Sequence, residues 1–512
     1  MKLATQKLIK EIDNYAESVL NISTRTLMGR AGSAVASSAR GMVSPGAKIL
    51  ILAGKGNNGG DGYAAAAELC ADYSVTVCDL FRAGQRSEAG KHYLALAQAR
   101  GVDVFSGDSQ RLGELVGSSD LIIDAIFGTG FSGEVSGELR ELAALVNASA
   151  AQVLAVDIPL GVCSDTAEVD PHGVRADLTV ALTLRKPCHI SYPAREYVGA
   201  VVLDTLGLDA YLDNPSFIFN NLAMDEALAA DCLPKRHNTS NKGSFGKTLH
   251  LTGSDKYRGA AHLALEASLR SGVGIVAHFG TPELNAELRM KYPEAIYHDG
   301  ALVVGEVLPL AEKYSSILVG SGSSVTEELY RVTAELIATE GCPLVLDADA
   351  LNSISRFGKA EVLKGAKRKI ILTPHPLELS RLTGLSTDYI ATHRISVATD
   401  FAREYGVILL LKGAATVITD GTHTYLNTTG STALSKGGSG DVLAGLVASL
   451  CAYSHSLTRV VALAAYIHGR AGDTLSAELS DFGVTPSDLP TEIARHIRLL
   501  QNEKLDKTPK QT

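Results

Sequence analysis

The sequence contains no tryptophan and only 7 cysteines among its 512 residues. The cysteines are scattered, and none belongs to a C-x-x-C pair, which is typical of zinc sites and thiol redox motifs. An odd, dispersed set of cysteines is also a poor basis for a disulfide framework. We therefore expect reduced thiols buried in the core of a cytoplasmic protein.

A run of basic residues is missing as well, and the formal net charge is −9. Both features argue against nucleic acid as a partner. No stretch of eighteen apolar residues occurs, which argues against a membrane-spanning helix, and the first lysines precede no apolar signal-peptide core. The composition, 46% apolar and 20% charged, is that of a globular protein. We expect small-molecule partners, no membrane, no nucleic acid and a homo-oligomer.

The sequence does contain an alternation of short apolar runs with alanine- and leucine-rich helical runs, in both halves of the chain. Apolar strands separated by helices predict a parallel sheet covered on both faces, so the fold class is α/β, with three layers in each half. One hydrophobic core is not enough for a chain of this length. Residues 214–241 carry prolines and interrupt the alternation, which predicts one domain at 1–215 and another at 226–505.

The predicted strands are rich in valine, isoleucine and leucine and are bounded by turn residues. They cover residues 48–53, 74–79, 120–125, 152–157, 177–183, 200–203, 247–252, 274–278, 316–320, 343–347, 369–373 and 407–412. The predicted helices include residues 62–71, 90–100, 259–271, 325–339, 388–404, 440–452 and 457–477.

A glycine-rich segment, residues 54–62, follows the first strand. Its glycines fit G-x-G-x-x-G, and Asp79 lies further on, where a dinucleotide-binding fingerprint has an acidic residue. However, Asp61 would face a bound pyrophosphate, and Asn57 and Asn58 add side-chain oxygens to the loop. Such oxygens suit a hard cation better than a phosphate alone. A nicotinamide dehydrogenase therefore remains only an alternative.

Two further acidic side chains, Asp124 and Asp157, end strands of the same predicted sheet. Ligands bind at the carboxyl ends of parallel strands, so these residues indicate a site. A flexible loop, residues 125–134, follows Asp124 and offers N–H groups for a phosphate. The alternative is that these are acidic turns without function.

In the second half, Gly437-Gly438-Ser439-Gly440-Asp441 leads directly into the apolar stretch 442–448. A helix start with free N–H groups binds anions. A bound phosphate would repel Asp441, which indicates a base that deprotonates a hydroxyl beside a phosphoryl group in transfer. The alternative is a helix capped by glycine and aspartate.

Four more polar segments end predicted strands of the second half. They are 320–324, 347–352, 373–378 and 412–416. The last begins with Lys412 and a glycine, a pattern that suits a nucleotide phosphate or ribose. His375 stands between two prolines, which fix its place, although a lone histidine in a turn is often only solvent-exposed.

The motifs of the first half resemble those of the NAD(P)HX epimerase family, in particular Asn-Asn-Gly-Gly-Asp-Gly at 57–62 and Asp-Ile-Pro at 157–159. The resemblance covers about residues 1–215 and implies a Rossmann-like domain. It implies that Asn58 and Asp124 bind potassium and that Asp157 faces the substrate as a catalytic residue. Leu160 stands where the family has serine, which removes one potassium ligand. The implied substrate contacts are Asn57, Asn58, Gly59, Gly60, Asp61, Gly128, Thr129, Gly130, Phe131, Ser132, Gly133, Glu134 and Asp157.

The motifs of the second half resemble those of the ADP-dependent NAD(P)HX dehydratase family, a branch of the ribokinase-like fold. Gly-Gly-x-Gly-Asp, Asp-Ala-Asp-Ala-Leu-Asn and Thr-Pro-His-Pro-x-Glu all occur. The resemblance, over about residues 235–500, implies substrate contacts at Ala260, Gly322, His375 and Asp441, with Asp441 catalytic. It implies adenine-nucleotide contacts at Lys412, Gly413, Ala414, Ala415, Thr416 and Gly440. The family's Gly-Pro-Gly-Leu-Gly is Gly-Ser-Gly-Ser-Ser here, at 320–324.

Together the two resemblances imply a bifunctional enzyme that repairs hydrated NADH and NADPH. The first domain would interconvert the R and S epimers, and the second would dehydrate the S epimer with ADP as co-substrate, releasing AMP and phosphate. Magnesium is expected on the phosphates, with Glu378 or Asp347 near it. The alternative is a ribokinase-like small-molecule kinase whose N-terminal domain binds without catalysis.

Overall fold

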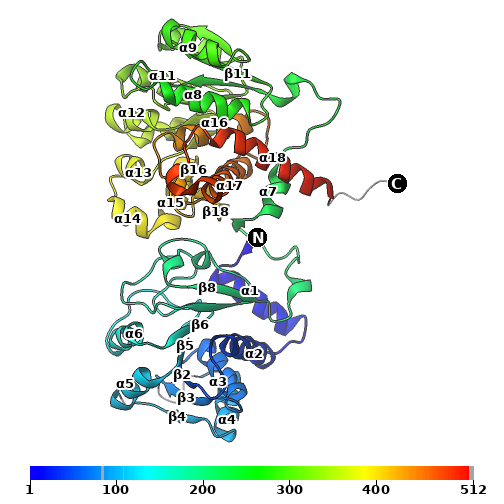
Figure 1. The fold of residues 1–512 in the computed structure, drawn as a ribbon, viewed down its shortest axis with the longest axis vertical. Coiled ribbons are helices and arrows are strands. Elements are labelled where there is room, and N and C mark those ends of the chain that lie inside the picture. The colour runs from blue at the N-terminus through cyan, green and yellow to red at the C-terminus, as the bar shows by residue number, and fades with distance from the viewer. Residues whose placement is uncertain (82–85, 108, 507–512) are drawn as a thin grey trace. The chain divides into compact units, whose positions relative to one another are not determined.

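The computed structural model describes residues 1–81, 86–107 and 109–506. It divides into two compact units, each with its own sheet. The N-terminal unit comprises Lys2–Asn221, and the C-terminal unit comprises the chain from Leu222 onward together with Met1 (Figure 1). Among the described helices, none combines the length and the apolar character that crossing a membrane requires.

The N-terminal unit has a seven-stranded sheet in the order β4-β3-β2-β5-β6-β7-β8, and all neighbours pair in parallel. This order places the central strands β2, β5 and β6 side by side, so their carboxyl ends meet at one edge. The strands are β2 (Lys48–Ala53), β3 (Ser74–Asp79), β4 (Asp103–Phe105), β5 (Leu121–Ala125), β6 (Gln152–Val156), β7 (Leu178–Leu182) and β8 (Ala200–Asp204), and the two-residue strand β1 (Lys2–Leu3) begins the chain.

The alternation of side chains in β2 explains the three layers of this unit. Ile49 and Ile51 belong to the core beneath one group of helices, whereas Leu50 and Leu52 belong to a second core on the other face. Both faces are therefore buried, as the continuous apolar strand predicts. The helices are α1 (Gln6–Ser18), α2 (Thr24–Met42), α3 (Asn57–Leu69), α4 (Glu88–Ala99), α5 (Ser109–Ser118) and α6 (Glu138–Ala148).

The prediction of a helix at 62–71 was wrong at its start, because α3 already begins at Asn57. Gly56 is its N-cap, so half of the glycine-rich segment is helical. The glycines are needed for close packing: a Cβ on Gly59 would lie 2.0 Å from the carbonyl oxygen of Gly54. The sequence also gave no indication of the short edge strand β4.

The C-terminal unit has the strand order β9-β18-β17-β16-β15-β14-β13-β10-β11-β12. Strands β10 to β16 pair in parallel, whereas β17 and β18 form an antiparallel extension that the sequence did not predict. Met1 exchanges backbone hydrogen bonds with Ala223 in β9. The strands are β9 (Asn221–Met224), β10 (Lys247–Leu251), β11 (Ile275–Gly280), β12 (Ile296–Asp299), β13 (Ser316–Val319), β14 (Leu344–Leu346), β15 (Ile370–Leu372), β16 (Ile408–Leu411), β17 (Val417–Thr419) and β18 (Thr424–Asn427).

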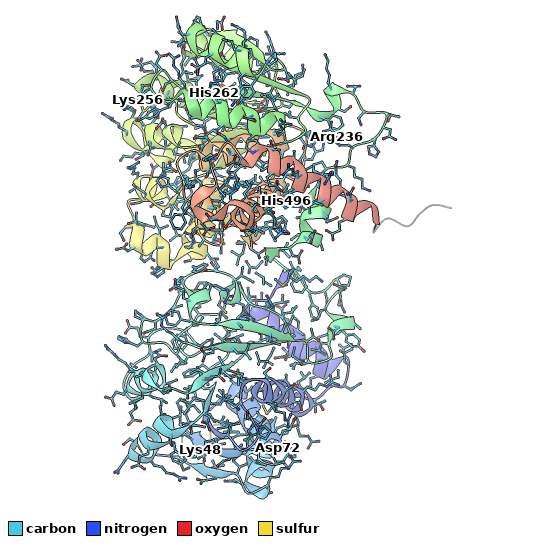
Figure 2. All side chains as sticks on the ribbon, in the orientation of Figure 1. Lys48, Asp72, Arg236, Lys256, His262 and His496 are labelled. Atoms are coloured by element: carbon cyan, nitrogen blue, oxygen red, sulfur yellow. The ribbon has the colours of Figure 1, made fainter. Side chains whose placement is uncertain are left out.

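Helix α16 (Ser439–Cys451) belongs to an extensive apolar core of this unit, and almost every residue of it is buried. It packs on α8 (Arg258–Leu269), on which Figure 2 labels His262. The other helices are α7 (Glu226–Cys232), α9 (Pro282–Lys291), α10 (Val304–Ala311), α11 (Glu327–Ala338), α12 (Asp349–Phe357), α13 (Pro376–Thr383), α14 (Thr387–Thr392), α15 (Arg394–Tyr405), α17 (Leu457–Gly483) and α18 (Leu489–Asp506). The α/β fold class of both units is thereby confirmed.

Candidate functional site

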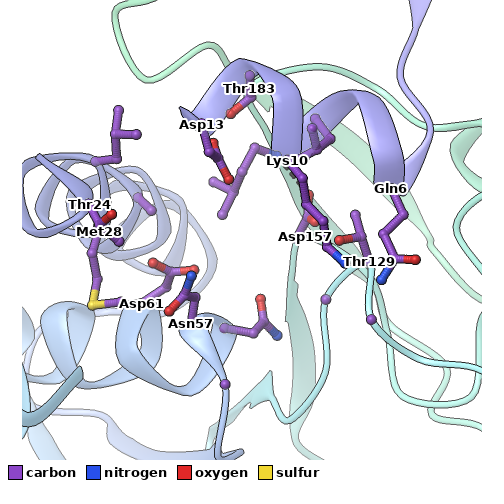
Figure 3. Close-up of a pocket in the computed structure, with 18 of the residues that line it drawn as sticks. Gln6, Lys10, Asp13, Thr24, Met28, Asn57, Asp61, Thr129, Asp157 and Thr183 are labelled. Atoms are coloured by element: carbon purple, nitrogen blue, oxygen red, sulfur yellow. Dashed lines mark hydrogen bonds between the residues drawn. The ribbon is translucent and has the colours of Figure 1, made fainter. Parts of the chain in front are cut away.

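A cavity of about 610 Å³ lies in the N-terminal unit where β2, β5, β6 and β7 end (Figure 3). Helix α1 supplies a wall of this cavity through Gln6, Lys10 and Asp13, and α3 supplies another through Asn57, Asn58 and Asp61. The loop Gly128–Gly130 and the strand-end residue Asp157 complete it. The cavity therefore occupies the carboxyl edge of the sheet, where parallel strands bind their ligands.

Asp157, directly after β6, is held by Lys186. The Lys186 ammonium contacts Oδ1 of Asp157 and donates a hydrogen bond of 2.7 Å to the carbonyl of Leu182. The N–H of Leu182 donates to the same carboxylate oxygen at 3.0 Å. Lys186 is fully buried, so its ammonium needs this carboxylate as a partner.

His189 supports the same pair through the main chain. Its Nδ1 accepts the N–H of Lys186 at 3.0 Å, which leaves the proton on Nε2, where it is donated to the carbonyl of Asp157 at 2.9 Å. Burial, together with the nearby Lys186, lowers the pKa of His189 to about 4. The imidazole is therefore neutral and fixes the backbone of Asp157, whose φ of 65° lies in the left-handed region.

Asp13 and Asp61 enter the cavity from different helices. Burial raises the pKa of Asp61 well above its usual range, and the nearby charges of Asp157 and Asp13 add to this. Burial also raises the pKa of Asp13 to about 6, although Lys186 opposes the shift. Lys186 therefore contacts Asp157 and also acts electrostatically on Asp13.

Asp124 is fully buried beneath the cavity. Its two oxygens accept the N–H groups of Leu160 at 2.7 Å and Ile126 at 3.1 Å, and burial raises its pKa to about 6. Asn58 has a buried amide nitrogen without a hydrogen-bond partner among the described residues, and the oxygen and nitrogen of an amide are interchangeable in assignment. Asn58 therefore fits a cation ligand, whereas the Leu160 side chain belongs to the apolar core and supplies no oxygen.

The cavity brings together some, but not all, of the residues predicted from the sequence. Those that line it are Asn57, Asn58, Asp61, Gly128, Thr129, Gly130 and Asp157. Those that do not line it are Gly59, Gly60, Phe131, Ser132, Gly133 and Glu134. Sequence reasoning missed Gln6, Lys10, Asp13 and Lys186. For Lys186, its place just beyond the end of a predicted strand was a usable signal, but α1 carried none.

A second cavity, of about 510 Å³, lies in the C-terminal unit between the starts of α8 and α16. Of the predicted residues, Ala260, Gly322, Gly438 and Asp441 line it. Asp349 and Lys256, the latter labelled in Figure 2 on the loop before α8, also line it. Gly322 has a φ of 66°, and a Cβ on it would lie 2.5 Å from Cβ of Ala260. Glycine is therefore required where these two walls meet.

The start of α16 has the predicted turn. Gly438 is the N-cap with a φ of 108°, a conformation that favours glycine. The backbone N–H of Ser439 donates to the carbonyl of Lys436 at 3.2 Å, so this N–H is not free, contrary to the prediction from the sequence. The N–H groups of Gly440 and Asp441 donate to no carbonyl in the described chain. Burial, with Asp347 nearby, raises the pKa of Asp441 to about 7. A base that titrates near neutral pH thus stands beside free amides at the positive end of a helix.

Lys412, after β16, joins this site to the end of β14, two strands away in the sheet. Its ammonium lies 2.8 Å from Oδ1 of Asp347, which also accepts the hydroxyl of Thr373 at 2.7 Å. Oδ2 of Asp347 accepts the hydroxyl of Ser321 at 2.9 Å. The Lys412 ammonium lies next to the start of α16, since a Cβ added to Gly440 would be 3.4 Å from the Lys412 Nζ. A phosphate there would meet a lysine and amide N–H groups together.

The predicted nucleotide segment, Gly413 to Thr416, is the turn between β16 and β17. Thr416 donates its hydroxyl to the carbonyl of Gly413 at 2.9 Å. Arg394, which sequence reasoning missed, donates to the carbonyls of Leu411 and Lys412, both at 3.2 Å. Burial lowers the pKa of Arg394 to about 10, which marks it as a buried cation that supports this turn.

His375 caps α13 rather than facing solvent alone. The ring Nδ1 of His375 accepts the backbone N–H groups of Leu377 and Glu378. The backbone N–H of His375 donates to the Glu378 carboxylate at 2.8 Å. Both carboxylates expected near magnesium, Glu378 and Asp347, therefore already accept hydrogen bonds from protein donors. Among residues 1–81, 86–107 and 109–506, no cluster of three or more His, Cys, Asp or Glu side chains suits a metal.

Comparison with known proteins agrees with this geometry. A family described as NAD(P)H-hydrate dehydratase matches residues 249–495, and one described as YjeF-related protein N-terminus matches residues 24–188. The bifunctional NAD(P)H-hydrate repair enzyme Nnr of Thermofilum pendens is 31% identical, spanning 98% of this chain and 97% of that protein. The chain belongs to this family. The protein of the same name in Moorella thermoacetica is 32% identical, spanning 98% of both chains.

The family also explains the C-terminal unit's fold. The crystal structure of an ADP/ATP-dependent NAD(P)H-hydrate dehydratase from Bacillus subtilis, co-crystallised with ATP and Mg²⁺, is 30% identical, with a TM-score of 0.51. The match covers 55% of this chain and all of that one. The C-terminal unit therefore shares the fold of that dehydratase.

Proposed function

We propose that the protein repairs hydrated NADH and NADPH. The N-terminal unit interconverts the R and S epimers, and the C-terminal unit dehydrates the S epimer in an ADP-dependent reaction that releases AMP and phosphate. This proposal is supported by membership of the bifunctional family and by the two separate cavities. The predicted division of labour between residues 1–215 and 226–505 follows the same reasoning.

One observation carries the dehydratase assignment: the Asp441 carboxyl stands beside free N–H groups and the Lys412 ammonium. Asp441 takes the proton of the substrate hydroxyl, whose oxygen attacks the terminal phosphorus of ADP and displaces AMP. The N–H groups of Gly440 and Asp441 stabilise the charge that grows on the phosphoryl oxygens. The phosphorylated carbon then loses phosphate, and a proton leaves the neighbouring carbon to restore the ring double bond.

The remaining contacts of the dehydratase follow from the family resemblance, because His375 and residues 412–416 are not among the residues that line the cavity. Ala260, Gly322 and His375 contact the hydrated ring portion of the substrate. The turn from Lys412 to Thr416 contacts the adenine nucleotide, and a magnesium ion on its phosphates would lie near Asp347 or Glu378. The ATP and Mg²⁺ of the Bacillus subtilis structure support a nucleotide in this fold.

In the N-terminal unit the hydrated dinucleotide contacts Asn57, Asn58, Asp61 and the loop 128–134, and Asp157 faces the reacting ring. Asn58 and Asp124 would hold the potassium ion, with main-chain carbonyls in place of a side-chain oxygen at Leu160. A cytoplasmic location and a homo-oligomeric state stay predictions from the sequence.

The proposal is tested by supplying hydrated NADH with ADP or ATP and following the return of reduced-ring absorbance. We expect nucleotide-dependent recovery of NADH with stoichiometric phosphate and, with ADP, AMP. Asp441→Asn should lower the rate at least about 100-fold, because the hydroxyl loses its base. A stably phosphorylated product without NADH would instead show a kinase of the ribokinase-like class.

A further inference from the structure

The two acidic side chains of α1 and α3, Asp13 and Asp61, differ from the others in the N-terminal cavity. Asp61 is only 7% exposed, lines the cavity, and has no hydrogen bond or ion pair with any described residue. The carboxyl of Asp13 likewise has no protein partner in the described ranges and faces the same space (Figure 3). Because Asp61 is buried, its lack of a protein partner indicates that a ligand supplies one, and the half-buried Asp13 faces the same space.

Asp157, by contrast, already has protein partners. Its Oδ1 is occupied by the Lys186 ammonium and by the N–H of Leu182. Protonation of Asp157 would leave a fully buried lysine without a counter-charge, which is costly. Asp157 therefore provides a fixed negative charge, with Lys186 as its positioning residue.

Inversion of the hydrated carbon has a definite geometric requirement. Water adds to an enamine double bond of a dihydropyridine ring at the carbon next to nitrogen, so that carbon carries both the hydroxyl and the ring nitrogen. When the C–O bond breaks, the nitrogen lone pair forms a planar iminium ion. A new water must then attack the opposite face, so one proton-transferring group is needed on each side of the ring.

We propose that Asp13 and Asp61 are the two proton-transferring groups of the epimerase, one from α1 and one from α3, on opposite faces of the hydrated ring. This inference rests on the proposed epimerase function. The carboxylic acid on one face protonates the hydroxyl, which leaves as water while the nitrogen lone pair forms the C=N bond. Water adds to the other face, the C=N electrons return to nitrogen, and the opposing carboxylate takes the proton. No electrons are gained or lost overall.

The electrostatics of the cavity match these roles. Burial, with Asp157 and Asp13 nearby, raises the pKa of Asp61 well above its usual range, which favours the protonated form that an acid needs. The pKa of Asp13, about 6, leaves it mainly ionised at neutral pH as the base. The fixed charge of Asp157 stabilises the iminium ion between them. In the reverse direction the two carboxyls exchange roles.

The first test replaces each carboxyl by its amide in the full-length protein. Asp13→Asn and Asp61→Asn should each lower the rate of epimerisation, measured without ADP on one purified epimer, at least 100-fold. The thermal shift produced by the hydrated dinucleotide should change little, and ADP-dependent dehydration of the S epimer should remain. Glu11→Gln is the matched control on α1, because Glu11 is exposed and lies outside the cavity. Epimerisation within tenfold of wild type in either variant would overturn the proposal.

The second test follows oxygen. A hydrate made in ordinary water is inverted by the wild-type protein in H₂¹⁸O, and we expect one ¹⁸O in each inverted molecule after subtraction of the spontaneous reaction. Inverted product that keeps its original oxygen would refute water loss and re-addition. If the wild-type protein does not raise the rate of epimerisation above the spontaneous rate, the proposed epimerase function is wrong. This result is distinguishable from an active wild-type protein whose Asp13 and Asp61 variants epimerise at an unchanged rate.

Discussion

The ammonium of Lys412 lies 2.8 Å from Oδ1 of Asp347, although the two residues are 65 positions apart in the sequence. The pair joins the ends of β14 and β16 and adjoins the start of α16. The Asp347 side chain is 2% exposed and that of Lys412 is 19% exposed. Lys412 therefore has two tasks, since it neutralises a buried carboxylate and presents a positive charge to the proposed phosphoryl site.

Lys412→Met should separate these two tasks. It leaves the Asp347 charge buried and unpaired, which is expected to destabilise the C-terminal unit by about 3 kcal/mol. Thermal unfolding and the KM for ADP are the measurements. Adding Asp347→Asn to Lys412→Met removes the unpaired charge, so stability should return while ADP-dependent activity stays low. Activity that returned together with stability would contradict the assignment of Lys412 to the nucleotide.

The dehydratase should depend on pH through Asp441. Burial and Asp347 raise its pKa to about 7, and only the ionised form can accept a proton, so kcat/KM should rise with pH and level off above 7. The raised pKa also means that the folded state keeps a proton that the unfolded state releases. Stability from this group is thus present below about pH 4 and is lost as pH rises to 7. In Asp441→Asn, the residual activity should lose this inflection and stability should vary less between pH 4 and 7.

Leu160 offers a test of the predicted potassium site. Leu160→Ser adds an oxygen at a fully buried position of the apolar core beside Asp124, and it removes a large side chain at a cost of about 2–4 kcal/mol. Leu160→Ala leaves the same cavity without the oxygen. We expect potassium to stimulate epimerisation, or to raise the melting temperature, more in the serine variant than in the alanine variant. Equal potassium responses would argue against a cation near Asp124.

Gly445 should be required for the position of α16. A Cβ on Gly445 would lie 2.2 Å from the carbonyl oxygen of Ala264 in α8. Gly445→Ala is expected to push the two helices apart, destabilise the C-terminal unit by about 1–3 kcal/mol and slow dehydration by displacing Asp441. Gly305→Ala in α10, where a Cβ meets nothing within 4 Å, is the control and should be neutral or slightly stabilising. Epimerisation should be unchanged in both variants.

Much of the fold could be predicted from the sequence, because the strands are short apolar runs whose pattern is local. β2 shows this well: a parallel strand buried on both faces needs the continuous apolar run of Lys48–Ala53. The hairpin of β17 and β18 was missed, since Thr-rich strands at the edge of an α/β domain lack that pattern. The start of α3 was missed because glycines usually interrupt helices, and only close packing makes them favourable here.

The sequence by itself determined the α/β class, the likeness to two linked families, and the strand-end motifs around Asp157 and Asp441, because each motif is contiguous. Only the tertiary structure decided which charges meet. Lys186 reaches Asp157, Asp13 reaches the cavity of Asp61, and Lys412 reaches Asp347 through packing between distant segments. The pKa shifts of Asp61 and Asp441 arise mainly from burial, a property of the folded chain that no run of neighbouring residues encodes.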